Sequence, residues 1–161
     1  MGMVIREFED RDAERVAEIM YESFRTVYDD PKKVTRRPPA YWIARSHAED
    51  SDRTVTSFVA EVDGTVAGYL NVTALKNFGL GILEVIGVDP KIFAKGIGQA
   101  LFAEAEKFWK SLKMRKIYTC TSHTNLRAQA FYKKAGFVEE GRLKSHFHSG
   151  IDEIQLSKFY E

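Results

Sequence analysis

The fold depends most on the stretch IGVDPKIFAKGIGQALF, residues 86–102. A β-rich run, Ile82–Val88, stops at Asp89 and Pro90, because proline cannot donate to a continuing strand ladder. A four-residue loop leads to Gly96 and Gly98, which open a helix. Free backbone N–H groups and the positive end of the helix dipole then suit a phosphate or pyrophosphate. A plain strand-to-helix turn is the equally open alternative.

Two common nucleotide-binding motifs are absent from this stretch. A dinucleotide fingerprint needs a third glycine where Leu101 stands, and a P-loop needs Gly-Lys followed by Ser or Thr. The glycine pair by itself therefore matches neither nucleotide motif and leaves a phosphate site and a plain strand-to-helix turn both open.

Around this stretch, β-rich and helical patterns alternate along the chain. After Gly98, apolar residues at helical spacing from Leu101 to Leu112 form one wide face that needs a sheet to cover. The pair Asp63-Gly64 favours a type I′ hairpin turn. Strands are expected at Val4–Arg6, Ser57–Val62, Thr65–Leu75, Ile82–Val88, Lys116–Thr121, Phe137–Phe147 and Ile151–Phe159. The other helices are expected from Asp10 or Asp12 through Val27, at Tyr41–Ala48, and at Asn125–Ala135 before Gly136.

This order predicts an α/β fold in one domain spanning residues 1–161. Two β-hairpins joined by helical crossovers imply a mixed, mostly antiparallel sheet of about seven strands, with helices on both faces.

Composition narrows the classes of function. Twenty-four Lys and Arg against 23 Asp and Glu leave a net charge of +1, which gives no footprint for nucleic acid or an acidic membrane surface. No run of about 20 apolar residues predicts a membrane span, and the N-terminus has no signal-peptide pattern. A single cysteine, Cys120, forms no internal disulfide. A cytoplasmic protein is expected.

A second informative segment runs from Asn125 to Phe137. On a helix, Phe131 and Tyr132 lie on one face, and phenylalanine there is expected in the core. Tyr132 differs, because a buried hydroxyl needs a partner and a phenol facing a cleft can donate a proton to a leaving group.

The order of these motifs resembles the GNAT family of N-acetyltransferases, which bind acetyl-CoA. The resemblance covers nearly the whole chain, is most specific across Val88–Gly98 and Asn125–Phe137, and implies the single-domain three-layer GNAT fold. It implies that helix-opening amides hold the CoA pyrophosphate, that the end of the fourth strand pairs with the pantetheine arm, and that Tyr132 is the acid that protonates the thiolate. The implied coenzyme contacts are Ile86, Val88, Ala94, Lys95, Gly96, Ile97, Gly98, Gln99 and Asn125.

One position departs from the family pattern. The glycine segment usually begins with Gln or Arg three residues before its first glycine, whereas this chain has Phe93. The backbone is expected to carry the binding, with Lys95 supplying positive charge.

Acyl transfer needs a group that accepts the amine proton, hydrogen-bond donors that stabilise the carbonyl oxygen, and a group that stabilises or protonates the leaving thiolate. Glu84 is the candidate base, because it shares strand parity with Ile86 and Val88 and has apolar neighbours. The alternatives are an exposed charge or a group that only attracts the substrate ammonium. The resemblance also places Tyr28, Arg36, Arg37, Tyr41 and Trp42 on the acceptor side.

The expected reaction is direct transfer from acetyl-CoA to a primary amine of a small molecule or a protein, in a ternary complex. Cys120 lies within a predicted strand without a neighbouring histidine, which disfavours an acyl-cysteine intermediate. Two alternatives stay open, a noncatalytic acyl-CoA-binding module and a metal-dependent hydrolase built on His146, His148 and Asp152. No metal is expected, because a fourth ligand is missing. The edge of the last hairpin could pair with a second copy as a homodimer.

Overall fold

The computed structural model describes residues 2–92 and 96–160. The strands are β1 Met3–Glu7, β2 Arg53–Val62, β3 Thr65–Leu75, β4 Leu80–Val88, β5 Lys116–Ser122, β6 Val138–His148 and β7 Ile151–Phe159. The α-helices are α1 Ala13–Phe24, α2 Pro39–Ser46, α3 Ile97–Ser111 and α4 Leu126–Lys134.

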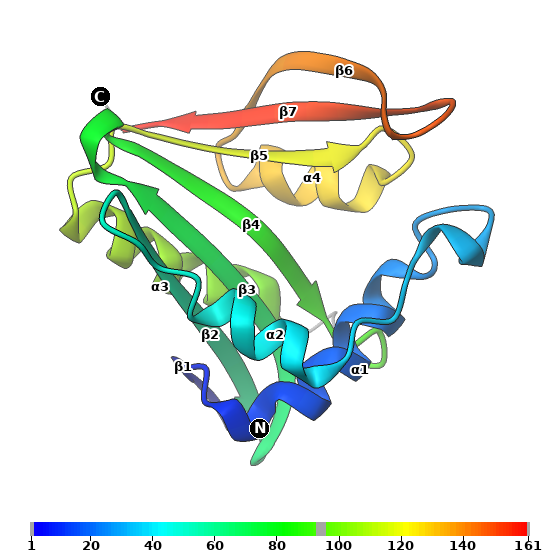
Figure 1. Ribbon diagram of the computed structural model, residues 1–161, viewed down its shortest axis with the longest axis vertical. Coiled ribbons are helices and arrows are strands. Elements are labelled where there is room, and N and C mark those ends of the chain that lie inside the picture. Colours follow the sequence, from blue (N-terminus) through cyan, green and yellow to red (C-terminus); the bar gives the residue numbers. More distant parts are fainter. Residues whose placement is uncertain (1, 93–95, 161) are drawn as a thin grey trace.

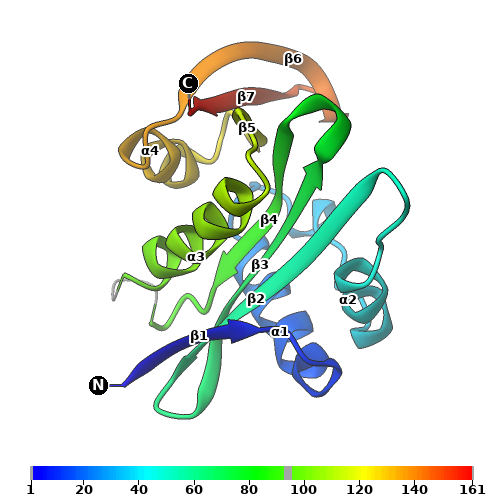
Figure 2. The same ribbon diagram turned by 90° about the vertical axis from the view of Figure 1, so that its left-hand side faces the viewer.

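These strands form one sheet in the order β1-β2-β3-β4-β5-β7-β6, in which only the β4–β5 pair is parallel. Helices α3 and α4 pack on one face, and α1 and α2 on the other (Figures 1 and 2). A Cβ on Gly68 would meet Ile97 of α3, whereas one on Gly87 would meet Met20 of α1, which fixes the two faces. The predicted mixed sheet covered on both faces is confirmed.

Local signals placed most elements correctly. Asp63 and Gly64 have φ angles of 50° and 82°, the two positive values that a type I′ turn requires. Asn125 caps α4, because its Oδ1 accepts from the Ala128 amide at 3.1 Å, and Gly136 follows the helix with a φ of 100°.

Several predicted boundaries were wrong, and three of them have a clear structural reason. Helix α1 ends at Phe24 rather than Val27, and the residues after it turn toward the other half of the sheet, where the Thr124 hydroxyl donates to the Val27 carbonyl at 3.1 Å. Helix α2 begins at Pro39, because proline is tolerated in the first helical turn. Strand β2 begins at Arg53, four residues before the predicted start, because its pairing with β3 continues to Leu75.

The decisive feature of the sheet is a fork between β4 and β5. Their parallel ladder covers three residue pairs, from Leu80 opposite Lys116 to Ile82 opposite Tyr118, after which the strands diverge (Figure 1). We call the divergence of Leu83–Val88 from Thr119–Ser122 the fork. At its apex, the Thr119 hydroxyl donates to the Leu83 carbonyl at 2.9 Å.

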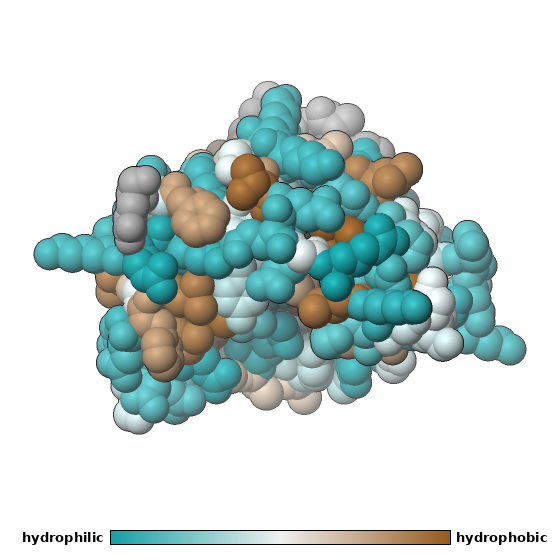
Figure 3. All heavy atoms as spheres, turned by 90° about the horizontal axis from the view of Figure 1, so that it is seen from above, coloured by the Kyte–Doolittle hydropathy of each residue, from teal (hydrophilic) through white to brown (hydrophobic). Residues whose placement is uncertain are grey.

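The sheet has two exposed edges, β1 and β6. Viewed from the side of the β6–β7 hairpin, the surface is largely hydrophilic with separate hydrophobic patches (Figure 3). Val138 and Phe147 of β6 are 54% and 67% exposed, so the predicted exposed edge of the last hairpin is confirmed. The predicted homodimer stays a prediction. Within the described residues, no helix combines the length and the apolar character needed to cross a membrane.

Candidate functional site

A cavity of about 1370 Å³ opens at the fork and is bounded by both of its arms. The cavity brings together eight of the predicted site residues, namely Glu84, Ile86, Val88, Gly96, Gly98, Gln99, Asn125 and Tyr132. The sequence separates these residues by up to 48 positions, and the fork unites them because β4 is followed by α3 and β5 by α4.

The cavity reaches both faces of the sheet. Ile86 and Val88 pack with the core beneath α3 and α4, and Tyr132 and Phe131 of α4 belong to the same cluster. We call this half the α3/α4 side. On the other face, the cavity is lined by residues such as Tyr28, Tyr41 and Glu84, and we call that half the α1/α2 side.

The α3/α4 side contains the N-terminus of α3. Gly96 is the N-cap, with a left-handed φ of 76° that favours glycine, and it has no side chain to cover the first amides of the helix. Asp89 secures the strand end, accepting hydrogen bonds from the Lys91 amide and the Arg15 guanidinium. The predicted strand, turn and helix N-terminus are therefore present.

Gly98 lies where α3 approaches α4. A Cβ at this position would stand 3.1 Å from the Phe131 ring, closer than most contacts of that kind. The side chain of Ile97 is fully buried in the core, so only its backbone can serve the cavity. Ala94 and Lys95, two further predicted contacts, lie outside the described residues, as does Phe93.

Asn125 lies at the opposite wall of the cavity, at the start of α4. Its Oδ1 is engaged in capping the helix, which leaves the side-chain nitrogen to donate to a ligand. The residue therefore combines a structural role with a position suited to a coenzyme contact.

Tyr132 is 4% exposed and lines the cavity beside Thr119. Burial raises the pKa of its phenol to about 12, although an interaction with Thr119 acts in the opposite direction. The phenol is therefore protonated at neutral pH and able to donate.

Glu84 lines the cavity, but the reason predicted for its orientation was wrong. A β-bulge in β4 pairs Leu83 with Val72 and Val85 with Asn71, so Glu84 is the extra residue and strand alternation is interrupted there. The Glu84 carboxylate consequently faces the α1/α2 side, where it accepts from the Thr73 hydroxyl at 3.0 Å and pairs with Arg45 at 3.5 Å. Its surroundings are polar rather than apolar, and it does not share a face with Ile86 and Val88.

The sequence analysis missed Glu153, a carboxylate on β7 that is 6% exposed and lines the same cavity. Strand β7 pairs with β5, with Glu153 opposite Ser122. Because Ile154 and Leu156 face the core under α3 and α4, strand alternation turns Glu153 to the α1/α2 side. The local sequence gives no signal of this burial, which depends on the pairing register.

Of the residues expected to border the acceptor, Tyr28 and Tyr41 line the cavity. Arg36 and Arg37 instead line a separate hollow of about 320 Å³ with Glu14, and Trp42 is buried against Tyr69. The expectation was therefore wrong for these three residues.

The structure does not favour cysteine or metal chemistry. Partial burial and the charge of Glu153 raise the pKa of the Cys120 thiol, which disfavours a reactive thiolate. The Asp152 carboxylate is engaged by Arg142 at 2.6 Å and by the Ser145 amide at 2.9 Å. Among residues 2–92 and 96–160, no three His, Cys, Asp or Glu side chains are grouped to hold a metal ion.

The chain is similar in sequence to known acetyltransferases. Residues 13–137 match the sequence model of the Acetyltransferase (GNAT) family. An uncharacterized N-acetyltransferase of Methanocaldococcus jannaschii is 27% identical over 157 residues, covering 97% of this chain and 91% of the relative.

Solved structures share the fold at low identity. A ribosomal-protein-alanine N-acetyltransferase from Brucella melitensis superimposes with a TM-score of 0.79 and 20% identity, covering 98% of this chain and 99% of that protein. The PaiA N-acetyltransferase from Thermoplasma acidophilum, solved in complex with coenzyme A, gives a TM-score of 0.74 and 23% identity over 99% of this chain and 100% of that protein.

Proposed function

Because the chain belongs to the GNAT family of acetyltransferases and is thus an acetyl-CoA-dependent N-acetyltransferase, we propose that it transfers the acetyl group directly to a primary amine at the fork. The observation that carries this proposal is that one cavity joins the α3 N-terminus, the open edge of β4 and the Tyr132 phenol. The coenzyme occupies the α3/α4 side, and the acceptor enters from the α1/α2 side.

The coenzyme is held mainly by backbone groups. The first amides of α3, beginning at Ile97, meet the pyrophosphate with the positive end of the helix dipole. Beyond Ile82, the main chain of β4 has no ladder partner in the described part of β5, so this edge can pair with the amides of the pantetheine arm. Asn125 adds a side-chain donor on the opposite wall.

Transfer then requires one bond to form and one to break. The amine nitrogen attacks the acetyl carbon, the C–S bond breaks with its electron pair moving to sulfur, and the nitrogen loses a proton. Glu84 accepts that proton, directly or through a water molecule, from its position on the bulge facing the acceptor side. The Arg45 ion pair holds this carboxylate in place.

Tyr132 serves the departing sulfur. A thiol has an ordinary pKa of about 8.5, below that of the Tyr132 phenol, which burial raises to about 12, so the proton stays mainly on the phenol. The phenol therefore acts chiefly by donating a hydrogen bond that stabilises the thiolate as it forms.

A Tyr132→Phe variant tests the proposal. CoA release with a panel of amines is expected to show kcat reduced about a hundredfold to a thousandfold, the usual cost of removing one donor to a developing negative charge, while calorimetry shows unchanged coenzyme affinity. Tyr160→Phe is the matched control, since it removes a phenol outside the cavity. Unchanged turnover of Tyr132→Phe would exclude the assigned role. Tight CoA binding without acetylation of any amine by the unmodified protein would instead support a noncatalytic acyl-CoA-binding module.

A further inference from the structure

Two carboxylates on the α1/α2 side of the cavity differ in how their charges are balanced. Glu84 has a cation, Arg45, at 3.5 Å and a hydroxyl donor, Thr73, at 3.0 Å. Within the part of the chain that the structure describes, Glu153 has neither an ion pair nor a hydrogen bond, and burial and the more distant His123 are what act on its carboxyl group. The unbalanced negative charge of the acceptor side therefore belongs to Glu153.

The groups that face Glu153 form no ion pair with it in the described part of the chain. The phenol of Tyr28 and the thiol of Cys120 both have a raised pKa, chiefly through burial and further through the Glu153 charge, so both stay neutral. The remaining neighbour is His123, which follows β5.

The His123 ring is held by the backbone rather than by Glu153. The Asp152 amide nitrogen lies 2.9 Å from its Nδ1, and the Asp152 carbonyl oxygen lies 3.3 Å from the same nitrogen. His123 forms no ion pair with Glu153 in the described part of the chain, so it acts on the carboxylate only through its charge at longer range.

Burial also makes the charge of Glu153 costly. Its side chain is 6% exposed, and burial raises the pKa of the carboxyl, only partly offset by His123. A carboxylate kept in a cavity at this cost, without an internal partner, is matched best by a cation that arrives with a ligand.

The position of Glu153 separates it from the reacting atoms. Thr119, beside the Tyr132 phenol, and Ser122, opposite Glu153, are three residues apart on β5, which corresponds to about 10 Å along a strand. With the reacting amine near Tyr132, Glu153 is placed to receive a second group further along the same acceptor.

We propose that Glu153 binds a second, distal cationic group of the acceptor, so that the substrate class of this enzyme is an aliphatic diamine or polyamine. This inference rests on the proposed function and names the acceptor for the same site. The aromatic side chains of Tyr28 and Tyr41 line the same half of the cavity and suit the methylene chain and the cations at its ends.

A matched series of acceptors tests the inference. Hexamethylenediamine, hexylamine and aminocaproate share the same reacting amine and chain length but carry a positive, neutral or negative distal group. The unmodified protein is expected to use hexamethylenediamine with a kcat/KM about ten- to hundredfold above that of hexylamine, mainly through KM, and aminocaproate least.

Glu153→Gln should remove this discrimination. The ratio of kcat/KM for hexamethylenediamine to that for hexylamine is expected to fall to the factor that two equivalent amino groups give, through a loss of kcat/KM for hexamethylenediamine, while the affinity for coenzyme A stays the same. Asp152→Asn is the matched control, since it removes the same charge one residue away, where the carboxylate pairs with Arg142. It should keep the full ratio.

Four other results would contradict the inference or the proposed function. Equal use of hexylamine and hexamethylenediamine by the unmodified protein overturns the inference, as does a Glu153→Gln variant that slows all three acceptors equally, which would indicate a structural role. Acetylation of other amines without any of these three overturns the diamine class alone. No CoA release with any amine overturns the proposed function itself.

Discussion

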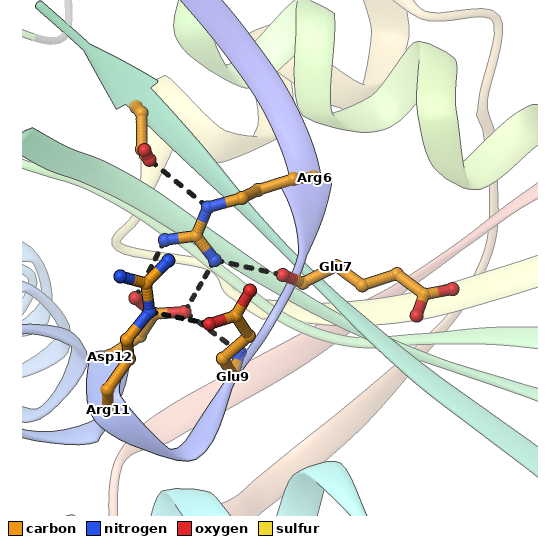
Figure 4. A network of polar contacts seen from close by, with 6 residues as sticks. Arg6, Glu7, Glu9, Arg11 and Asp12 are labelled. Carbon is orange, nitrogen blue, oxygen red and sulfur yellow. Dashed lines mark hydrogen bonds and ion pairs between the residues drawn. The ribbon is translucent and has the colours of Figure 1, made fainter. Parts of the chain in front are cut away.

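Two buried carboxylates in different regions of the molecule differ in their hydrogen-bond and ion-pair partners. Asp12, at the junction of β1 and α1, is 5% exposed, and Glu153, at the fork, is 6% exposed. Asp12 accepts two hydrogen bonds of 2.8 Å from the Arg6 guanidinium and one of 2.8 Å from the Glu9 amide (Figure 4). Glu153 has no such partners in the described chain.

The pKa shifts follow this difference. Burial opposes the charge on Asp12, but the hydrogen bonds of Arg6 and of the Glu9 amide outweigh it, so the pKa of Asp12 is lowered. Burial of Glu153 meets little opposition, so its pKa is raised. Equal burial thus marks a structural anchor in one place and a binding group in the other, and the network of partners distinguishes the two.

Removing the cation from the paired carboxylate gives the largest expected effect on stability. Arg6→Met leaves Asp12 buried without its partner and should lower the free energy of unfolding by about 3 kcal/mol, the low end for a broken buried pair because Arg6 is partly exposed. Urea denaturation measures this loss. The double variant Arg6→Met/Asp12→Asn should recover much of it, and a double variant as unstable as the single one would contradict this account.

Glu153→Gln should act in the reverse direction. Replacing an unpaired buried charge with a neutral side chain of similar shape is expected to raise the free energy of unfolding by about 1 kcal/mol, as often occurs where function requires an unfavourable group. Thermal and urea unfolding without ligand measure the gain. A loss of stability comparable to that of Arg6→Met would show that Glu153 has an internal partner.

The pH dependence of these two effects should differ in sign. The lowered pKa of Asp12 stabilises the fold above its unfolded value of about 3.8, so the cost of Asp12→Asn should shrink as the pH falls below that value. The raised pKa of Glu153 destabilises the fold above its folded pKa, so the gain from Glu153→Gln should be full there and vanish as the pH falls toward 4.5. Urea titrations from pH 3 to 8 compare them.

The smallest effect is expected at the exposed rim of the same N-terminal network. Arg11 pairs with Glu9 at 2.5 Å, but both side chains are largely exposed, 71% and 53%, and solvent screens them (Figure 4). Arg11→Ala should therefore change the free energy of unfolding by less than about 0.5 kcal/mol. A change as large as that of Arg6→Met would mean that solvent exposure does not weaken the contribution of this ion pair.

Local chemistry explains what could be predicted from the sequence. The Asp63-Gly64 turn, the Asn125 cap and the stop at Gly136 each depend on a few adjacent residues, so the corresponding elements were placed within a few positions. The glycine segment and Tyr132 were likewise found from motifs, and the structure places Gly96, Gly98 and Tyr132 around one cavity.

The wrong or missing predictions concern side chains whose orientation and burial depend on a neighbouring strand. Strand alternation along β4 predicted that Glu84 lies on the same face of the sheet as Ile86 and Val88. The bulge opposite Asn71 and Val72 interrupts the alternation, so Glu84 lies on the other face. Nothing in the run IDEIQLSKF, residues 151–159, distinguishes Glu153 from its neighbours. Its burial follows from pairing with Ser122 and from the loop around Tyr28.

The amino-acid sequence by itself determined the elements, their order and the glycine turn that opens α3, because helix periodicity, caps, turns and glycine conformations are properties of short segments. Only the tertiary structure decided that β4 and β5 separate after three pairs, that Glu84 has a counter-ion and that Glu153 has none among residues 2–92 and 96–160. Strand register and charge pairing join residues far apart in the chain, and the electrostatic balance of a buried site is the sum over those distant partners.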